Sequence, residues 1–381
     1  MSIGHHAAEV AVVGAGAFGA WTALILRERG ADVLLIDAYG PGNVRSSSGG
    51  ESRNIRAAYG EKEIYTRWTI ASWQEWQERE REFGMRLLYP SGSLRGGPEG
   101  ESEAQARIFS SLGQPFELLT GREAEHRWPQ LVFHDVERLF YEPLSGILLA
   151  RDALLAVTNA FLRKRGRMIA GRAGLHLRGE RLALDVDGST VEAERIVLAC
   201  GPWLPKLLPE LLADRIRTPR RELFFIAPAP GDRSFGWEHC PNVADPISWT
   251  SSDIGNGFKV APKLRGVLMD PDDGDHMPSP ALLDEVRSYL RRRAPALAER
   301  PVVSTFVGQL ENSATEDFLI DRHPSDPRLI IAGAGSGHAF KMGPAIGAYV
   351  ADLVLGEPQA PNLQSIFGLA AHRPLRADEG G

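Results

Sequence analysis

Residues 10–37 read VAVVGAGAFGAWTALILRERGADVLLID, and this stretch decides the fold. Residues 10–14 are apolar, mostly β-branched and end in glycine, which predicts a buried strand. Residues 17–29 predict a helix, because basic residues occupy its last turn and Gly30 follows where helices commonly end. Residues 33–37 predict a second buried strand. The stretch is therefore a βαβ unit with short connections, which requires parallel strands and a right-handed crossover.

The turn between strand and helix, GAGAFG at residues 14–19, has the GxGxxG pattern of a dinucleotide-binding site. Gly14 allows a tight turn, Gly16 lets the backbone approach a pyrophosphate, and Gly19 permits close packing of the helix on the strand. Asp37 ends the second strand close to the spacing of ~20 residues expected for an acid that binds a ribose. The N-terminus of the helix offers free N–H groups to the phosphates. We therefore predict a dinucleotide site, although the motif alone does not separate NAD from FAD.

The segment after the second strand, residues 40–60, is a polar loop with the sequence GPGNVRSSSGGESRNIRAAYG. A domain that binds only a nicotinamide dinucleotide would continue with another βαβ unit here. A long loop rich in serine, glycine and arginine suits an extended dinucleotide whose second half must be wrapped. The loop favours FAD, and a plain NAD-binding dehydrogenase stays open as an alternative.

The composition is that of an ordinary soluble globular protein, with 381 residues, 43% hydrophobic and 24% charged. The length suggests about two or three domains. A net charge of −6 without a block of basic residues argues against nucleic-acid binding. Cys200 and Cys240 form no CxxC pair, which favours a reducing, cytoplasmic location. His5-His6 has no carboxylate or cysteine partner in its neighbourhood of the sequence, so we expect no metal site.

The apolar run at residues 10–26 has a second interpretation as a signal peptide or membrane span. Glycines interrupt it, no Lys or Arg precedes it, and 17 residues are short for a span. We therefore expect no membrane segment there.

The rest of the chain predicts one parallel sheet with long insertions. Strands that end in glycine are predicted at residues 195–201 and 328–333, followed by a helix at residues 343–355. Because these pieces lie so far apart, the intervening segments must be excursions from the sheet. They include a Trp-rich polar helix at 62–83, strands of a different sheet at 86–96 and 217–230, a loop at 266–280 and a basic amphipathic helix at 281–293. The segment after Pro358 is expected to lie along the surface.

Three stretches carry a resemblance to a known family. They are SSSGGESRNIRAAYG at 46–60, GFK at 257–259 and DFLIDRHPSDPRLIIAGAGSGHAFKMG at 317–343, with RIVLACGPW at 195–203 as a further local motif. They resemble the flavin-dependent amine oxidases of the D-amino-acid-oxidase superfamily, in the branch of monomeric sarcosine oxidase and N-methyltryptophan oxidase. The resemblance covers nearly the whole chain, and the SGHxFK segment is its most specific part.

The resemblance implies an α/β protein, α+β overall, with two domains. A discontinuous Rossmann-like FAD-binding domain would comprise residues 1–85, 145–215 and 305–365. A substrate domain with a mixed or antiparallel sheet would comprise residues 86–144 and 216–304, and residues 366–381 would form a surface tail.

The resemblance also implies roles for three catalytic residues. Arg56 reaches the carboxylate of the substrate, and Lys341 shares that binding. Lys259 corresponds to the lysine above the flavin that activates oxygen. Arg53 supports the flavin region. The full set expected to contact the cofactor is Gly14, Gly16, Gly19, Asp37, Ala38, Ser47, Ser48, Arg53, Asn54, Gly201, Gly308, Gly335, Gly337, His338 and Lys341.

The sequence departs from the family pattern at several positions. Gly308 stands where the sarcosine branch attaches its flavin to a cysteine, so we expect FAD to be held non-covalently. A histidine pair before the arginine loop is replaced by Ser48-Gly49, and a histidine after the oxygen-activating lysine is replaced by Lys263. The wall of the substrate pocket therefore differs, and Phe225 and Trp249 are candidates for it.

We expect an enzyme that oxidises the C–N bond of an amino acid or N-alkyl amino acid by hydride transfer to the flavin N5, giving an imine and, with molecular oxygen, hydrogen peroxide. Arg56, Lys341 and Lys259 suit this chemistry, because clustered cations bind a carboxylate and favour the neutral form of the substrate amine. The alternatives are a flavin dehydrogenase with another electron acceptor or a hydroxy-acid substrate, and a flavin-binding protein without turnover. A monomer is favoured.

Overall fold

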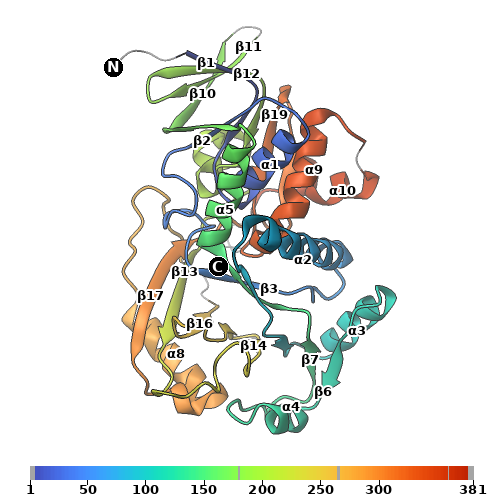
Figure 1. Cartoon of the computed structure of the whole chain (residues 1–381), viewed down its shortest axis with the longest axis vertical. Coiled ribbons are helices and arrows are strands. Elements are labelled where there is room, and N and C mark those ends of the chain that lie inside the picture. Colours follow the sequence, from blue (N-terminus) through green and yellow to red (C-terminus); the bar gives the residue numbers. More distant parts are fainter. Residues whose placement is uncertain (1–4, 179–180, 264–266, 359, 376–381) are drawn as a thin grey trace.

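The computed structural model describes residues 5–178, 181–263, 267–358 and 360–375, and it is built around two large sheets with a small one between them (Figure 1). Within this part of the chain, no helix is both long enough and apolar enough to span a bilayer.

The first sheet confirms the predicted Rossmann-like arrangement. Its parallel strands run in the order β9-β2-β1-β12-β19, and β18 pairs antiparallel with β19 at the edge. A hairpin of β10 and β11 pairs with the first half of β12. The bounds are β1 His5–Val13, β2 Val33–Asp37, β9 Arg167–Ala170, β10 Ala173–Arg178, β11 Arg181–Val186, β12 Ser189–Leu198, β18 Leu319–His323 and β19 Asp326–Gly333.

Helices α1 (Ala17–Glu28), α5 (Ala150–Arg163) and α9 (Gly343–Leu355) pack together beside this sheet, and α2 (Glu63–Phe83) packs against α9 (Figure 1). The tryptophans of α2 serve this packing. Trp76 is fully buried against Trp21, with ring centroids 5.0 Å apart, and its indole N–H donates to the Lys341 carbonyl oxygen at 2.8 Å. The packing of α2 thereby fixes the backbone of a predicted site residue.

The second sheet lies in the lower half of Figure 1 and has the strand order β17-β13-β16-β15-β14-β5-β7-β6. Its pairs are antiparallel except β14 with β5, so the predicted mixed or antiparallel sheet is found. The bounds are β5 Ser93–Arg95, β6 Glu117–Leu119, β7 Leu139–Glu142, β13 Arg220–Ile226, β14 Asn242–Ala244, β15 Ser248–Ser251, β16 Phe258–Pro262 and β17 Val302–Gln309. Strand β17 crosses residue 305, where the sequence had placed a domain boundary.

Side chains alternate between the two faces of this sheet. Phe224, Ile226, Phe258 and Val260 form one apolar face, which shares a core cluster with buried residues of α8 (Pro280–Arg293). The opposite face carries Leu223, Phe225, Trp249, Ala261 and Phe306.

The small sheet consists of β3 (Ser52–Ile55), β8 (Gly146–Leu149) and β4 (Leu88–Tyr89) in the order β3-β8-β4. The region 86–96 therefore contributes to two sheets, β4 to this one and β5 to the second. The remaining helices are α3 Glu101–Ser111, α4 Gly121–Arg127, α6 Leu204–Leu207, α7 Pro209–Leu212 and α10 Pro361–Phe367, with 3₁₀ turns at Gly201–Trp203, Pro295–Leu297, Phe340–Met342 and Leu369–Ala371.

The expectation of a surface tail is wrong for the described part of the C-terminal segment. Phe367 is fully buried and stacks on Phe318 at 5.7 Å, and His372 is buried with its Nε2 3.0 Å from the Phe318 carbonyl oxygen. The Pro- and Ala-rich composition suggested an exposed segment, but burying the aromatic ring of Phe367 stabilises the contact of this segment with the core. Residues 376–381 lie outside the described residues.

Candidate active site

A first cavity of about 210 Å³ opens beside the N-terminus of α1, where β1, β2 and β12 end. Ligands of open α/β sheets bind at this edge of the strands. The Asp37 carboxylate is held there by three backbone N–H donors, from Ala15 at 2.7 Å, Tyr39 at 2.8 Å and Gly40 at 2.7 Å. These bonds fix the position of the acid before any ligand arrives.

The glycines of residues 14–19 have separate structural reasons. Gly14 has φ +106°, and a Cβ there would lie 2.2 Å from the carbonyl oxygen of Ala199. A Cβ on Gly19 would lie 1.8 Å from the carbonyl oxygen of Gly14, so Gly19 serves the approach of α1 to β1 and does not line the cavity. The hydroxyl of Ser48 accepts a hydrogen bond from the Ala17 N–H at 3.0 Å and closes the other side of the turn.

A second cavity, of about 390 Å³, lies beyond the first, and Ser47 lines both. Its walls come from three parts of the chain: the loop around Arg53 and Arg56, the face of the second sheet that carries Arg95 and Trp249, and the turn at residues 336–338. Segments far apart in the sequence thus meet around one space.

Buried polar atoms without partners mark the junction of the two cavities. They are Ser47 Oγ, Gln309 Oε1, Glu311 Oε2 and Asn312 Oδ1, none of which has a hydrogen-bond partner among the described residues. A buried polar group left unpaired costs about 1–3 kcal/mol, so these atoms indicate a polar ligand that runs from one cavity to the other. A dinucleotide with an extended second half fits this requirement.

The sequence profile of the family described as "DAO: FAD dependent oxidoreductase" matches residues 9–353. The chain belongs to this family of FAD-dependent oxidoreductases. It is 27% identical over 367 residues to a monomeric sarcosine oxidase of Bacillus sp. (strain B-0618), covering 91% of this chain and 92% of that protein. It is also 27% identical over 377 residues to an N-methyl-L-tryptophan oxidase of Yersinia pestis (strain Pestoides F), covering 96% and 99%.

The fold is shared with solved structures at lower identity. An L-proline dehydrogenase from P. horikoshii superimposes with a TM-score of 0.81 at 21% identity, over 93% of this chain and 96% of that one. FAD is the cofactor of the family, and the residues present fit it. The first cavity would hold the adenosine end of FAD through Asp37 and the α1 N-terminus, and the second cavity would receive the flavin end.

The predicted cofactor residues divide into those that line a cavity and those that do not. The first cavity is lined by Gly14, Gly16, Asp37, Ala38, Ser47, Ser48 and Gly201, and the second by Ser47, Arg53, Gly308, Gly337 and His338. Gly19, Asn54, Gly335 and Lys341 line neither. The amide of Asn54 instead donates to Thr250 O at 2.9 Å and so ties β3 to β15, while the Gly335 N–H bonds the Glu311 carboxylate.

Arg56 and Lys341 converge on one tyrosine ring. The Arg56 guanidinium lies 4.7 Å and the Lys341 ammonium 4.9 Å from the centroid of Tyr59, within the range of cation–π attraction. Lys341 also donates to the His338 carbonyl oxygen at 3.0 Å, and Arg56 donates to the Ala58 carbonyl oxygen. Burial and the charge of Arg56 hold the pKa of Lys341 well below its usual value.

Glu142 is a buried carboxylate behind this pair, and the sequence analysis missed it. It accepts hydrogen bonds from the N–H groups of Ala57 at 2.6 Å and Ala58 at 3.2 Å, which fixes the loop that carries Arg56. Burial raises the pKa of Glu142 to about 7, against the opposing effect of Arg56 and Lys341. The carboxylate therefore neutralises only part of the positive charge at neutral pH.

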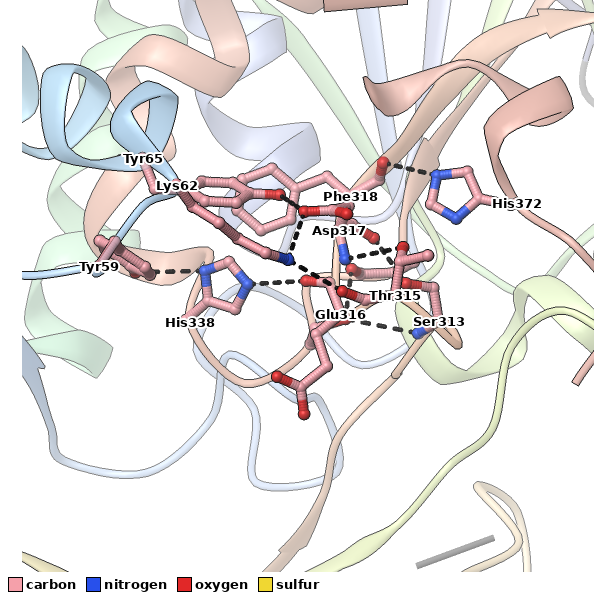
Figure 2. A network of polar contacts seen from close by, with 12 residues as sticks. Tyr59, Lys62, Tyr65, Ser313, Thr315, Glu316, Asp317, Phe318, His338 and His372 are labelled. Atoms are coloured by element: carbon pink, nitrogen blue, oxygen red, sulfur yellow. Dashed lines mark hydrogen bonds and ion pairs between the residues drawn. The ribbon is translucent and has the colours of Figure 1, made fainter. Parts of the chain in front are cut away.

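His338 lies between Tyr59 and Glu316, with a polar contact to each from its two ring nitrogens (Figure 2). Its Nε2 lies 2.9 Å from the Glu316 carbonyl oxygen, which only accepts, so Nε2 carries the hydrogen. Nδ1 then accepts from the Tyr59 hydroxyl at 3.2 Å. Burial and the charge of Lys341 lower the pKa of His338 to about 3, so it orients Tyr59 and holds no charge at neutral pH.

Lys259 is fully buried on β16, on the side of the second sheet that faces β3. Its ammonium donates to the carbonyl oxygen of Ser52 at 3.0 Å and to its hydroxyl at 2.7 Å, and lies 5.3 Å from the Trp249 ring, which lines the second cavity. Burial and the nearby Arg53 lower its pKa well below the usual value. Arg53 itself donates to the carbonyl oxygens of Ser47, Gly49 and Ser52, a structural role for the loop.

Proposed function

We propose that the protein oxidises the C–N bond of an amino acid or N-alkyl amino acid, with Arg56 and Lys341 binding the substrate carboxylate. The observation that carries this proposal is the convergence of a half-buried Arg56 and a buried Lys341 on Tyr59, which together with Arg56 lines the second cavity. The names of the two curated relatives, a sarcosine oxidase and an N-methyl-L-tryptophan oxidase, support the same substrate class.

The residues of the chain bind and orient the substrate in this proposal. A guanidinium and an ammonium on one carboxylate fix the distance and direction of the adjacent carbon. The same positive charges disfavour an ammonium and select the neutral amine. Oxidation removes a hydride from that carbon and a proton from the nitrogen, leaving a C=N bond. Bound FAD would accept the two electrons and, in an oxidase, pass them with two protons to oxygen as hydrogen peroxide.

We further propose that FAD is held without a covalent bond. Gly308 offers no nucleophile at the wall of the second cavity, where the flavin would lie. Cys200 lines the first cavity, where the adenosine end of FAD would lie. Burial raises the pKa of each cysteine to about 12, which keeps both thiols protonated.

Acid precipitation of the yellow holoprotein is therefore expected to release all of its flavin into the supernatant. The measurement is the visible absorbance of the supernatant and of the redissolved pellet. Flavin that stays in the pellet after denaturation contradicts non-covalent binding.

The binding of a simple carboxylate, such as propionate, is expected to take up protons above neutral pH. An anion beside Lys341 and Glu142 raises the pKa of both groups, so both gain protons on binding. The affinity for propionate should therefore fall as the pH rises above about 7, the value to which burial brings Glu142. Calorimetry in buffers of different ionisation enthalpy measures the uptake, and proton release or no pH dependence contradicts the site.

The experiment that tests the proposed function is anaerobic mixing of the holoprotein with matched compounds. Amino acids and N-methyl amino acids are expected to bleach the flavin band, whereas the corresponding 2-hydroxy acids should not. Air is then admitted, and hydrogen peroxide in amounts equal to the substrate consumed identifies an oxidase. Flavin that stays oxidised with every amino acid overturns the proposal.

A further inference from the structure

One face of the second sheet presents more positive charge to the cavity than a single carboxylate requires. Arg95 on β5 stands opposite Ala244 on β14, Ala244 opposite Trp249 on β15, and Trp249 opposite Ala261 on β16. Opposed residues share a face, and residues two apart along a strand share it too. Arg95 therefore lies on the same face as Trp249 and Lys259, toward the second cavity.

Arg95 lines that cavity with donors to spare. Its Nε donates to Glu101 Oε1 at 2.8 Å, and its two terminal nitrogens make no hydrogen bond to any described residue. The side chain is about a quarter exposed. The guanidinium of Arg95 therefore keeps hydrogen-bond donors beyond the one that the ion pair with Glu101 uses.

The charge of Arg95 acts on the carboxylate-binding pair without belonging to it. The charge of Arg95 lowers the pKa of both Arg56 and Lys341, although Arg95 is not one of the two cations that contact the Tyr59 ring. Lys263, two positions beyond Ala261, does not line the cavity, and partial burial together with the charges of Arg95 and Arg56 lowers its pKa. Against these charges stand three acids. Glu101, to which Gln105 also donates at 3.1 Å, and Glu316 line the same cavity, and Glu142 is partly neutral.

We propose that the substrate carries a second anionic group and that Arg95 binds this group while Arg56 and Lys341 bind the first carboxylate. The substrate class is then the acidic amino acids and N-(carboxyalkyl) amino acids, in which the second carboxylate stands on the side chain or on the nitrogen. This inference rests on the proposed function and narrows it.

Binding of unreactive ligands tests the inference first. Glutarate and its monoamide differ by one charge, and each is titrated into the wild-type holoprotein by calorimetry. Hydrogen bonds between charged groups contribute about 1.5–3 kcal/mol, so glutarate should bind about 10- to 100-fold more tightly. Equal affinity of the two ligands overturns the proposal and needs no variant.

Flavin reduction then locates the second group. N-methylglutamate is compared with N-methylglutamine for the side-chain position, and iminodiacetate with its monoamide for the nitrogen position. At least one charged member should exceed its amide by about tenfold or more in the ratio of reduction rate to dissociation constant. In Arg95→Gln the charged compound and its amide should reduce the flavin about equally well. Arg138→Gln, a control at an exposed arginine that pairs with Glu103, should keep the preference for the charged compound.

The two levels of the proposal fail separately. Neutral amino acids that reduce the flavin as well as acidic ones overturn the second anionic group and leave the proposed function standing. No reduction by any amino acid overturns both. An Arg95→Gln variant that keeps the full preference assigns the selectivity elsewhere and overturns the role of Arg95.

Discussion

Replacing Arg56 with alanine is expected to raise the KM for the amino acid substrate at least thirtyfold. Removing one partner of a buried charge pair costs about 2–5 kcal/mol, and each 1.4 kcal/mol is a factor of about ten. Lys341→Ala should have an effect of similar size, because both cations lie against the Tyr59 ring and would bind one carboxylate. Steady-state kinetics of each variant measure the change.

The Arg56→Ala, Lys341→Ala double variant tells whether the two residues bind one carboxylate together or contribute to binding independently. Since both residues bind one group, the combined loss should be smaller than the sum of the single losses. Arg67→Ala is the matched control, because Arg67 is exposed on α2 and pairs with Glu63, one turn away on the same helix. Unchanged kinetics in both single variants would remove the carboxylate site from this position.

Replacing Lys259 with methionine is expected to slow the reaction of the reduced enzyme with oxygen by at least about a hundredfold. Oxygen enters without charge and acquires a negative charge with its first electron, so a fixed cation nearby stabilises the transition state by an amount worth ~10²–10³ in rate. The ammonium of Lys259 is fixed by Ser52 and buried beside Trp249, and an arriving negative charge raises its pKa.

Stopped-flow measurement of both half-reactions tests this role of Lys259. Reduction by substrate should stay within about tenfold of wild type, because Arg56 and Lys341 remain to bind the substrate. Lys164→Met, an exposed lysine paired with Glu28, serves as the control. Normal reaction with oxygen together with a collapse of reduction would assign Lys259 to substrate binding and contradict its role toward oxygen.

The parts of the fold with strong local patterns could be predicted from the sequence. The βαβ unit, the helix at 343–355 and the two glycine-ended strands follow from periodicity and glycine position, and each ends within a few residues of the expected position, although β1 and β12 begin earlier than predicted. The C-terminal segment could not be predicted, because the burial of Phe367 depends on Phe318, which is distant in sequence. Local composition carries no information about such a contact.

The candidate site shows the same division. Arg53, Arg56 and Lys341 stand in motifs that mark them, and the structure brings Arg56 and Lys341 together at Tyr59. Glu142 and Arg95 stand in short strands with no motif, and only the register of β5, β7 and β14 shows that they share the cavity-facing side. The alternation of side chains along a strand can be read from the sequence, but the pairing and register of the strands cannot.

The central claim, a carboxylate held by Arg56 and Lys341 beside the flavin, is tested most directly by an anaerobic titration. An amino acid that reduces the wild-type holoprotein is compared with its own carboxamide, which keeps the amine, the C–H bond and the shape but removes the charge. The account predicts that the amide binds at least thirtyfold more weakly in the reductive half-reaction, by the same loss of a buried charge partner. It further predicts that this difference largely disappears in the Arg56→Ala, Lys341→Ala double variant. An amide that reduces the wild-type flavin with the same dissociation constant and rate as the acid would contradict the account.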